Sequence, residues 1–324
     1  MRRVRFHAYG GPEVLEIEEA GIPEPGPGQV LIKPEIIGAN YVDVQIRRET
    51  DPGSIYHRPL PATLTGDVVG VVERAGRGVD PALVGARVAA LSEDAMADYV
   101  TADAAWLIPL PGDADAVSAV MLPTVASVAM GVLNAGRTSA GDSVLITAAA
   151  GGVGHLAVQL ARHRGAGTII ATAGSAAKLA FLKELGADVV VDHTAQDWAE
   201  QVRQAVPGGV DVALDAIGGH TLHAAIGLLA PGGRAVAYGA ASGDLTSVPV
   251  GSLFMLRSLT GFAIMALRAT DEAQARADLA ELTALVTSGE LYGTAGLTLP
   301  LAEIVRAHRE LEARSFPGRL ILVP

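Results

Sequence analysis

Hydrophobic and polar positions follow two different patterns along the chain. From Val14 to about Tyr99, short apolar runs are separated by turn residues, as in "PEPGPG" from Pro23 and "GDVVGVVERAGRGV" from Gly66. Short runs that are broken by proline and glycine and lack a helical period predict a β-rich region. From about Ala116 onward the pattern becomes helical, as in "ADAVSAVMLPTVASVAMGVLNAG".

After Gly141, strand, glycine turn and helix alternate strictly. The runs "SVLITA", "GTIIATA", "DVVVDH", "VDVALDAI" and "GGRAVAYG" predict strands, and "GHLAVQLARHRG", "AAKLAFLKELG" and "DWAEQVRQAV" predict helices. Continuous Val, Ile and Ala runs between helices are typical of a parallel sheet that is covered on both faces. This part therefore predicts a doubly wound α/β domain. A long helix, "DEAQARADLAELTALVTSG", and an apolar C-terminal strand follow it.

Length and composition narrow the function. A chain of 324 residues exceeds the usual size of one hydrophobic core, which favours two domains. The net charge of -11 argues against nucleic acid as a partner, and the lack of cysteine excludes disulfides, thiol nucleophiles and Cys-based zinc sites. The start "MRRVRFHAYGGPEVLEIEE" has no apolar signal-peptide core, and no apolar run reaches membrane-spanning length. We therefore expect a cytoplasmic protein with no membrane partner.

A glycine loop lies between the first strand and helix of the α/β region. The strand "SVLITA" leads into Ala149-x-Gly151-x-x-Gly154, where a helix begins at once. Main-chain N–H groups and the positive end of a helix favour an anion, and glycine allows a pyrophosphate to approach the backbone. A tight turn without a ligand is the alternative, but the surrounding strand–helix units favour a dinucleotide site. Ala149 stands where a Rossmann fingerprint usually has its first glycine.

The end of the next strand indicates which dinucleotide is bound. NAD enzymes tend to carry an acid there, which bonds the ribose 2′-hydroxyl. Here "TIIATAGSAAK" offers Gly174, Ser175 and Lys178 and no acid. An acid would repel a 2′-phosphate, whereas a hydroxyl and an ammonium group would receive it, so we predict NADPH as the cofactor. The alternative for Lys178 is an ordinary solvated helix residue.

With these residues identified, the chain resembles the zinc-independent quinone oxidoreductases of the medium-chain dehydrogenase/reductase superfamily over essentially its whole length. The matching pieces, in order, are "GGPEVLEIEE", "PEPGPGQVLIK", "IGANYVDVQIR", "GDVVGVVERAGRGV", "GARVAAL", "AAAGGVGHLAVQLA", "LGADVVVDH", "GVDVALDAIGG", "GGRAVAYGAASG" and "RAHRELEARSFPGRLIL". The resemblance implies a β-rich GroES-like catalytic domain of residues 1–119 and 263–324, a Rossmann NADP-binding domain of residues 120–262, and a homodimer. The apolar run "SLFMLRSLTGFAIM" could form the dimer interface, a pocket wall or both.

The resemblance also assigns cofactor contacts. It places the pyrophosphate on the glycine loop, the 2′-phosphate after the next strand, the adenosine after the third strand and the nicotinamide after the fifth. For these four places, in that order, the residues are Gly151, Gly152, Val153 and Gly154; Gly174, Ser175 and Lys178; His193, where relatives often have Tyr; and Tyr238, Gly239 and Ala240. In addition, Arg314 would reach the cofactor from the C-terminal segment. Many relatives carry Thr at Val128, so that nicotinamide contact is lost or moves to Ser127.

Zinc-dependent relatives have a Cys ligand at the position of Asn40 and a His ligand at that of Gly66, so we predict no metal here. A pair on a predicted helix, His220 and His223, is the alternative metal site, but it has no third ligand nearby in the sequence. Without zinc, hydrogen-bond donors must stabilise the negative charge that develops on the substrate oxygen during hydride transfer.

Asn40 and Tyr41 are the catalytic candidates, because an amide and a phenol can both donate hydrogen bonds. The alternatives are a turn-stabilising role for Asn40 and apolar packing for the Tyr41 ring, and we expect Asp43 to stabilise the start of the following helix. Such donors are weaker than a metal, so they suit a small electrophile whose reduced form is a stabilised anion, namely a quinone or an α,β-unsaturated carbonyl. The alternatives are an enoyl-thioester reductase and a non-catalytic NADPH-binding protein.

Overall fold

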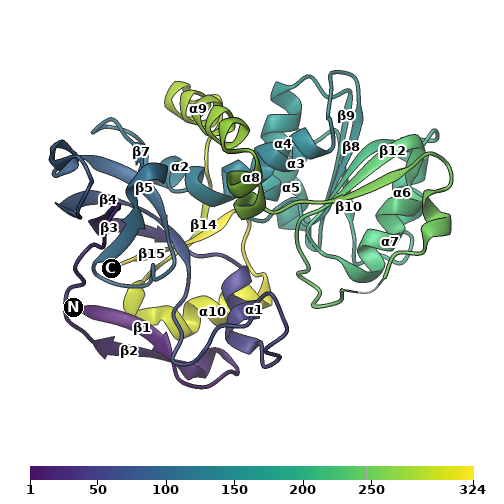
Figure 1. Cartoon of the computed structure of the whole chain (residues 1–324). Helices are drawn as coiled ribbons and strands as arrows, with labels where there is room; N and C mark the ends of the chain where they lie inside the picture. Colours follow the sequence, from purple (N-terminus) through teal and green to yellow (C-terminus); the bar gives the residue numbers. More distant parts are fainter. Residues whose placement is uncertain (246) are drawn as a thin grey trace. The chain divides into compact units, whose positions relative to one another are not determined.

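The chain folds into two compact units. The computed structural model describes residues 1–245 and 247–324 (Figure 1). Unit 1 comprises Met1–Thr124 and Tyr292–Pro324, and unit 2 comprises Val125–Leu291. No helix within the described ranges is long and apolar enough to cross a membrane.

Unit 1 contains a seven-stranded sheet and a two-stranded hairpin. The order in the sheet is β14-β15-β3-β4-β5-β7, and β6 pairs with β3. Neighbouring strands are antiparallel except β14 and β15. The strands of unit 1 are β1 (Arg2–Phe6) and β2 (Leu15–Glu19) in the hairpin, and β3 (Gln29–Gly38), β4 (Gly66–Ala75), β5 (Arg87–Ser92), β6 (Val100–Asp103), β7 (Ile108–Pro109), β14 (Ala295–Pro300) and β15 (Arg319–Val323) in the sheet.

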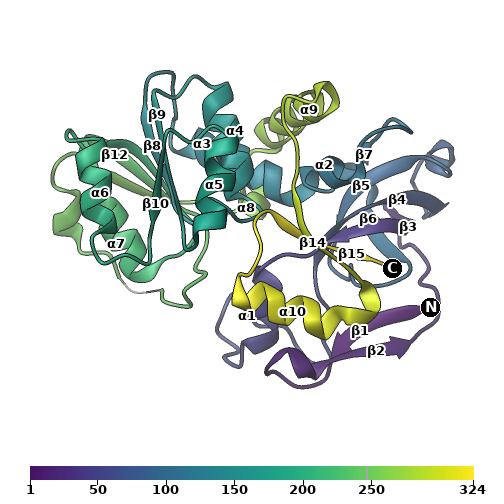
Figure 2. The same ribbon diagram turned by 180° about the vertical axis from the view of Figure 1, so that it is seen from behind.

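Alternation along the strands and one amphipathic helix build the core of unit 1. In β3 the buried Ile32 and Pro34 alternate with the exposed Lys33 and Glu35, because successive side chains of a strand point to opposite faces. The helices of this unit are α1 (Val42–Arg48), α2 (Ala116–Ala119) and α10 (Ile304–Ala313). Figure 2 shows α10 beside α1, and the buried Arg47 of α1 forms an ion pair with a glutamate of α10.

Unit 2 is built around six parallel strands in the order β10-β9-β8-β11-β12-β13. The strands are β8 (Ser143–Ile146), β9 (Thr168–Ala173), β10 (Val189–Asp192), β11 (Val210–Asp215), β12 (Leu229–Ala237) and β13 (Ser258–Gly261). Every residue of β8 is buried, which explains why such strands read as unbroken apolar runs. The predicted doubly wound parallel sheet is confirmed.

Helices cover both faces of this sheet. Figures 1 and 2 show α4 and α5 on one face and α6 and α7 on the other. The helices of unit 2 are α3 (Ser127–Ala135), α4 (Gly154–His163), α5 (Ala176–Glu184), α6 (Trp198–Ala205), α7 (Gly219–Gly227), α8 (Ile264–Thr270) and α9 (Glu272–Ser288). From β8 the chain runs outward through β9 and β10, and then returns to β11 on the other side of β8. The switch point therefore lies between β8 and β11, where doubly wound sheets bind ligands at the carboxyl ends of the strands.

Residues 263–291 belong to unit 2, where α8 and α9 pack against α3. The side-chain amide of Asn134 on α3 donates to both carboxylate oxygens of Asp278 on α9, at 3.0 and 2.9 Å. The packing units consequently change at 124/125 and 291/292. The predicted domain boundaries at 119/120 and 262/263 follow the arrangement of the family and stay a prediction.

Asp43 of α1 is a buried carboxyl with a structural contact that the sequence did not indicate. Its Oδ1 accepts from the main-chain N–H and the hydroxyl of Thr65, at 2.9 and 3.0 Å, and helix α1 has no side-chain cap. The carboxyl therefore anchors the segment before β4, and because Asp43 also lies in the first turn of α1, its expected role at the helix start stays a prediction. Oδ2 has no hydrogen-bond partner among the described residues. Burial raises the pKa of Asp43 to about 7, against the opposing effects of Thr65 and Arg319.

This raised pKa predicts a pH-dependent contribution to stability. A carboxyl that binds its proton more tightly in the folded chain stabilises the fold fully below its ordinary pKa of 3.8 and loses that contribution as the pH rises to about 7. We expect Asp43→Asn to flatten the fall in unfolding free energy over this pH range, at about 1.4 kcal/mol per pKa unit. Urea unfolding of both proteins between these pH values measures the difference. Parallel pH profiles would contradict the assignment.

Candidate active site

The loop after β8 contains the predicted pyrophosphate site. Ala148 lies in the left-handed region with φ of 48°, and the N–H of Gly151 donates to the Ala148 carbonyl oxygen at 3.0 Å. This turn directs the chain into α4, which begins at Gly154. The first N–H groups of a helix have no partner within the helix, so they can bind an anion at this loop. The left-handed residue is Ala148, one position before the alanine that replaces the usual first glycine.

Gly151 and Gly154 are glycines for different reasons. A Cβ at Gly154 would lie 2.5 Å from the Cα of Ala149 and 2.6 Å from the carbonyl oxygens of Ala148 and Ala149. Only glycine therefore allows the start of α4 to pack against the loop. A Cβ at Gly151 would meet only the Ala148 carbonyl oxygen at 3.4 Å, which is an ordinary contact. The loop is consequently open at Gly151, where a bound group can approach the backbone.

A buried threonine–aspartate pair ties this loop to the end of β11. The hydroxyl of Thr147 donates to Oδ1 of Asp215 at 2.7 Å and accepts from the N–H of Ala216 at 3.2 Å. Oδ2 of Asp215 accepts from the N–H of Gly218 at 2.6 Å. Both side chains are fully buried, and burial raises the pKa of Asp215. The pair therefore joins the segments that follow the two strands of the switch point.

The residues predicted to line the nicotinamide side follow β12 at the same edge of the sheet. The N–H of Tyr238 donates to the main-chain oxygen of Asp215 at 2.9 Å. Burial raises the pKa of Tyr238, and the Asp215 carboxylate adds to this shift, so the phenol stays protonated. A Cβ at Gly239 would lie 2.6 Å from the carbonyl oxygen of Ala216, so a glycine is needed where these two loops meet. Ala240 is buried beside them.

The residues predicted for the 2′-phosphate and adenosine lie after β9 and β10. A Cβ at Gly174 would lie 3.4 Å from the His193 ring, and the N–H of His193 donates to the Ala173 carbonyl oxygen at 3.2 Å. Ser175 is the N-cap of α5, and its hydroxyl makes no capping bond. Lys178 is half-buried in the first turn of this helix. Lys178 is the one charged residue of the segment 174–178, so the segment carries a positive charge.

In unit 1 a buried arginine holds Asn40, which lies between β3 and α1. Nη2 of Arg319 donates to Oδ1 of Asn40 at 2.8 Å, and Arg319 is only 2% exposed. The arginine side chain has hydrogen-bond donors and no acceptor. The amide therefore turns its oxygen to Arg319, and its NH2 group remains the part that can donate to another molecule.

Arg319 itself is surrounded by acceptors. It donates to Oδ2 of Asp67 at 2.6 Å, to the carbonyl oxygen of Gly38 at 2.9 Å and to that of Val120 at 2.8 Å. The other oxygen of Asp67 accepts from the hydroxyl of Thr124 at 2.6 Å. A Cβ at Gly38 would lie 2.5 Å from Cζ of Arg319, so glycine there makes room for the guanidinium. The network fixes the arginine at the ends of β3 and β15.

Asn40 and Gly66 stand where the resemblance places the zinc ligands of zinc-dependent relatives. The oxygen of Asn40 is bound to Arg319, whose positive charge would also repel a cation. A Cβ at Gly66 would lie 2.9 Å from the Cβ of Ala95 and 3.1 Å from the carbonyl oxygen of Gly38, so a ligand side chain has no room.

Other groups of ligand-type side chains do not add a metal centre near these residues. Across residues 1–245 and 247–324, the one group of three acids or histidines within mutual reach is His7, Glu16 and Glu18, on the β1–β2 hairpin. The His220–His223 pair lies on α7 as predicted. Nε2 of His223 lies 3.0 Å from a main-chain carbonyl oxygen, and the pair belongs to no group of three among the described residues.

Two residues that were predicted separately meet in unit 1. Nη2 of Arg314 donates to the hydroxyl oxygen of Tyr41 at 3.3 Å, and its guanidinium carbon lies 5.4 Å from the centre of the Tyr41 ring. A hydrogen bond combined with a cation–π contact fixes the orientation of the phenol. Tyr41 therefore uses its polar group in the structure and is more than an apolar ring.

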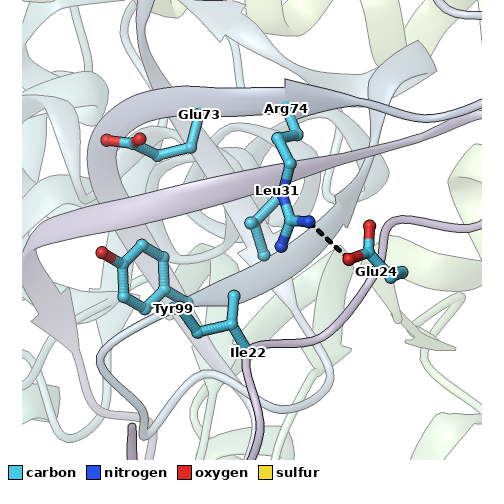
Figure 3. Close-up of a pocket in the computed structure, with 6 residues that line it drawn as sticks. All are labelled: Ile22, Glu24, Leu31, Glu73, Arg74 and Tyr99. Atoms are coloured by element: carbon cyan, nitrogen blue, oxygen red, sulfur yellow. Dashed lines mark hydrogen bonds and ion pairs between the residues drawn. The ribbon is translucent and has the colours of Figure 1, made fainter.

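A hollow of about 360 Å³ in unit 1 contains none of these residues (Figure 3). Figure 3 shows that Arg74 turns toward Glu24 at its rim, where the two form an ion pair. The residues that line it are Ile22, Glu24, Leu31, Glu73, Arg74 and Tyr99.

Sequence reasoning missed the residues that support the site. Arg319 opens the apolar strand "RLILV", Asp67 interrupts "GDVVGVV", and Asp215 ends "VDVALD". A charged residue in an otherwise buried strand needs a partner, because burying an unpaired charge is costly. This signal was available, although it does not identify the partner.

Known proteins are similar to this chain over essentially its whole length. Residues 26–112 match the alcohol dehydrogenase GroES-like domain, and residues 152–285 match the zinc-binding dehydrogenase family. The chain is 33% identical to 2-haloacrylate reductase of a Burkholderia species, over 98% of each protein, and 32% identical to quinone oxidoreductase of Pseudomonas aeruginosa, over 100% of this chain and 99% of that protein. A mycobacterial protein solved with NADPH is 34% identical, with a TM-score of 0.92 and 100% of both chains covered. The chain therefore belongs to the quinone oxidoreductases of the medium-chain dehydrogenase/reductase superfamily.

Proposed function

We propose that this protein uses NADPH to reduce quinones or α,β-unsaturated carbonyl compounds without zinc. The observation that carries the proposal is an amide at position 40, whose oxygen is bound by Arg319 and whose NH2 group can donate. A hydrogen-bond donor stabilises negative charge on a substrate oxygen, and a conjugated acceptor spreads that charge over several atoms. The names of two relatives support this class, since a quinone and a 2-haloacrylate are both conjugated acceptors.

The proposed cofactor is supported by the residues of unit 2 and by the mycobacterial structure that contains NADPH. The open side of the loop at Gly151 fits a diphosphate, and the acid-free segment with Ser175 and Lys178 fits a 2′-phosphate. When bound, NADPH supplies a hydride. The residues proposed to hold it are Gly151, Gly152, Val153, Gly154, Gly174, Ser175, Lys178, His193, Tyr238, Gly239, Ala240 and Arg314.

In the proposed reaction the protein's own groups act on the oxygen and the proton. Asn40 donates a hydrogen bond to the substrate oxygen, where negative charge develops as the substrate carbon gains a hydride. Tyr41 supplies a proton to the reduced substrate, and Arg314 holds the phenol in position. No residue at the positions of the zinc ligands has room or a spare acceptor for a metal, which supports a reaction without zinc.

The decisive experiment follows NADPH oxidation with p-benzoquinone, cyclohexenone, 2-chloroacrylate and crotonyl-CoA, with and without EDTA. We expect turnover of the quinone or the enone and no effect of the chelator. Turnover of the thioester alone would identify an enoyl-thioester reductase. A tight NADPH complex without turnover of any acceptor would indicate a non-catalytic binding protein. Loss of activity in EDTA with recovery on zinc addition would refute the zinc-free reaction.

The glycine loop gives a test of the cofactor site. We expect Gly151→Ala to raise the Kd for NADPH about tenfold or more, which corresponds to about 1.4 kcal/mol, because the added methyl group occupies the open side of the loop. The melting temperature should stay near that of the wild type, since the methyl group meets only one protein atom. Gly227→Ala on α7, where a Cβ meets no protein atom within 4 Å, is the matched control. Fluorescence titration that shows equal affinity in Gly151→Ala and wild type would exclude this loop.

The segment after β9 gives a test of the preference for NADPH. A charge-assisted contact contributes about 1.5–3 kcal/mol, and less where water screens it, so Lys178→Ala should raise the KM for NADPH about tenfold. The KM for NADH should not change. Lys183→Ala, which removes an exposed lysine from the same helix, is the control. Steady-state kinetics with both cofactors decides the matter, and equal effects on NADH and NADPH would overturn the assignment.

Two further expectations stay predictions. A homodimer is supported by the exposed Phe254, Met255 and Leu256, which precede the edge strand β13, and sedimentation equilibrium of the purified protein would test it. A cytoplasmic location is testable by fractionation of the source cells.

A further inference from the structure

We propose that Arg319 is a positioning residue for the reaction, because it holds the Asn40 amide with the NH2 group directed to the substrate oxygen. The inference rests on the proposed function, in which Asn40 donates to that oxygen. Arg319 lies 279 residues from Asn40 in the sequence, and Nη2 reaches Oδ1 at 2.8 Å.

The chemistry of the two side chains determines the orientation of the amide. An amide carries an acceptor on one side and two donor hydrogens on the other, and its last torsion has two broad minima. Beside a guanidinium, which has only donors, the minimum with the oxygen facing Arg319 is strongly favoured. In the other minimum the amide oxygen would face the substrate and repel the negative charge that develops there. Arg319 therefore selects the orientation that is useful for reduction.

The arginine can select an orientation because it is itself held. It is 2% exposed and donates to Asp67, whose second oxygen accepts from Thr124. The carbonyl oxygens of Gly38 and Val120 receive further N–H groups of the arginine. The positive charge also polarises the amide, which strengthens the NH2 group as a donor. The amide is thus fixed before the substrate arrives.

Arg319 also fastens the main chain around the end of β3, so the test must separate catalysis from stability. We expect Asn40→Ala to lower kcat about 100-fold, as for loss of a donor to a developing oxyanion, with less than a twofold change in the KM for NADPH. Arg319→Gln should lower kcat about tenfold with the same unchanged KM. In the double variant, kcat should equal that of Asn40→Ala alone, because the arginine acts through the amide.

A second buried arginine of unit 1 provides the matched control. Arg47 is fully buried and pairs with Glu312 and the Gly10 carbonyl oxygen, and it has no hydrogen bond to Asn40. Arg47→Gln should lower the melting temperature and leave kcat within twofold of the wild type. It should also leave kcat unchanged when combined with Asn40→Ala.

If Arg319→Gln does not fold, Thr124→Val tests the same network. It keeps the shape of the side chain and removes only the hydrogen bond to Asp67. We expect kcat to fall about threefold in the wild-type background and not at all in Asn40→Ala. Independent losses that multiply in either double variant would overturn the role of Arg319 while leaving the proposed function intact. Wild-type protein without turnover of any acceptor would overturn both, and an unchanged kcat in Asn40→Ala would remove the donor on which the inference rests.

Discussion

The buried ion pair of Arg319 and Asp67 is the constraint around which unit 1 is organised. Taking both charges out of water costs several kcal/mol, and the cost is offset only if every donor and acceptor is satisfied. Here the arginine also donates to the carbonyl oxygens of Gly38, at the end of β3, and of Val120, and the aspartate also accepts from the hydroxyl of Thr124. The pair and its partners therefore bring together four segments that are distant in sequence, at residues 38–40, Asp67, residues 120–124 and Arg319. Asn40 stands where these segments meet and shares the arginine.

Unit 2 also contains a buried pair of polar side chains that bond to each other. Thr147 and Asp215 are fully buried and bonded to each other, and they connect the loops after β8 and β11. An uncompensated carboxylate beside an anion-binding loop would repel a phosphate. Asp215 instead accepts hydrogen bonds from a hydroxyl and a main-chain N–H, which compensate its charge. A buried polar pair thus shapes each of the two regions to which the proposed function assigns a role.

The sequence predicted strands β8 to β12 of unit 2, because unbroken apolar strands are local patterns, but it did not predict β13, which lies in the run "SLFMLRSLTGFAIM". The glycine spacing located the loop for the same reason. The supporting contacts could not be predicted in this way, since Arg319 and Asp67 are 252 residues apart and Tyr41 and Arg314 are 273 apart. The contact of Asp43 with Thr65 could not be predicted for the same reason, because Thr65 lies 22 residues away and outside the helix. Local patterns indicate that a buried charge needs a partner, but only the fold identifies that partner.

The strength of the proposed donor bears on the class of substrate. A zinc ion places a full positive charge on a developing alkoxide, whereas a single neutral hydrogen-bond donor in an oxyanion site supplies about 2.7–4 kcal/mol. Arg319 adds positive charge behind the amide, but its N–H groups are already bonded to protein acceptors, so it cannot contact the substrate oxygen as a metal would. Reduction of a simple ketone concentrates charge on one oxygen and would need the stronger stabilisation. A quinone or an enone delocalises the charge before the proton arrives, and for such an acceptor a well-oriented amide is sufficient.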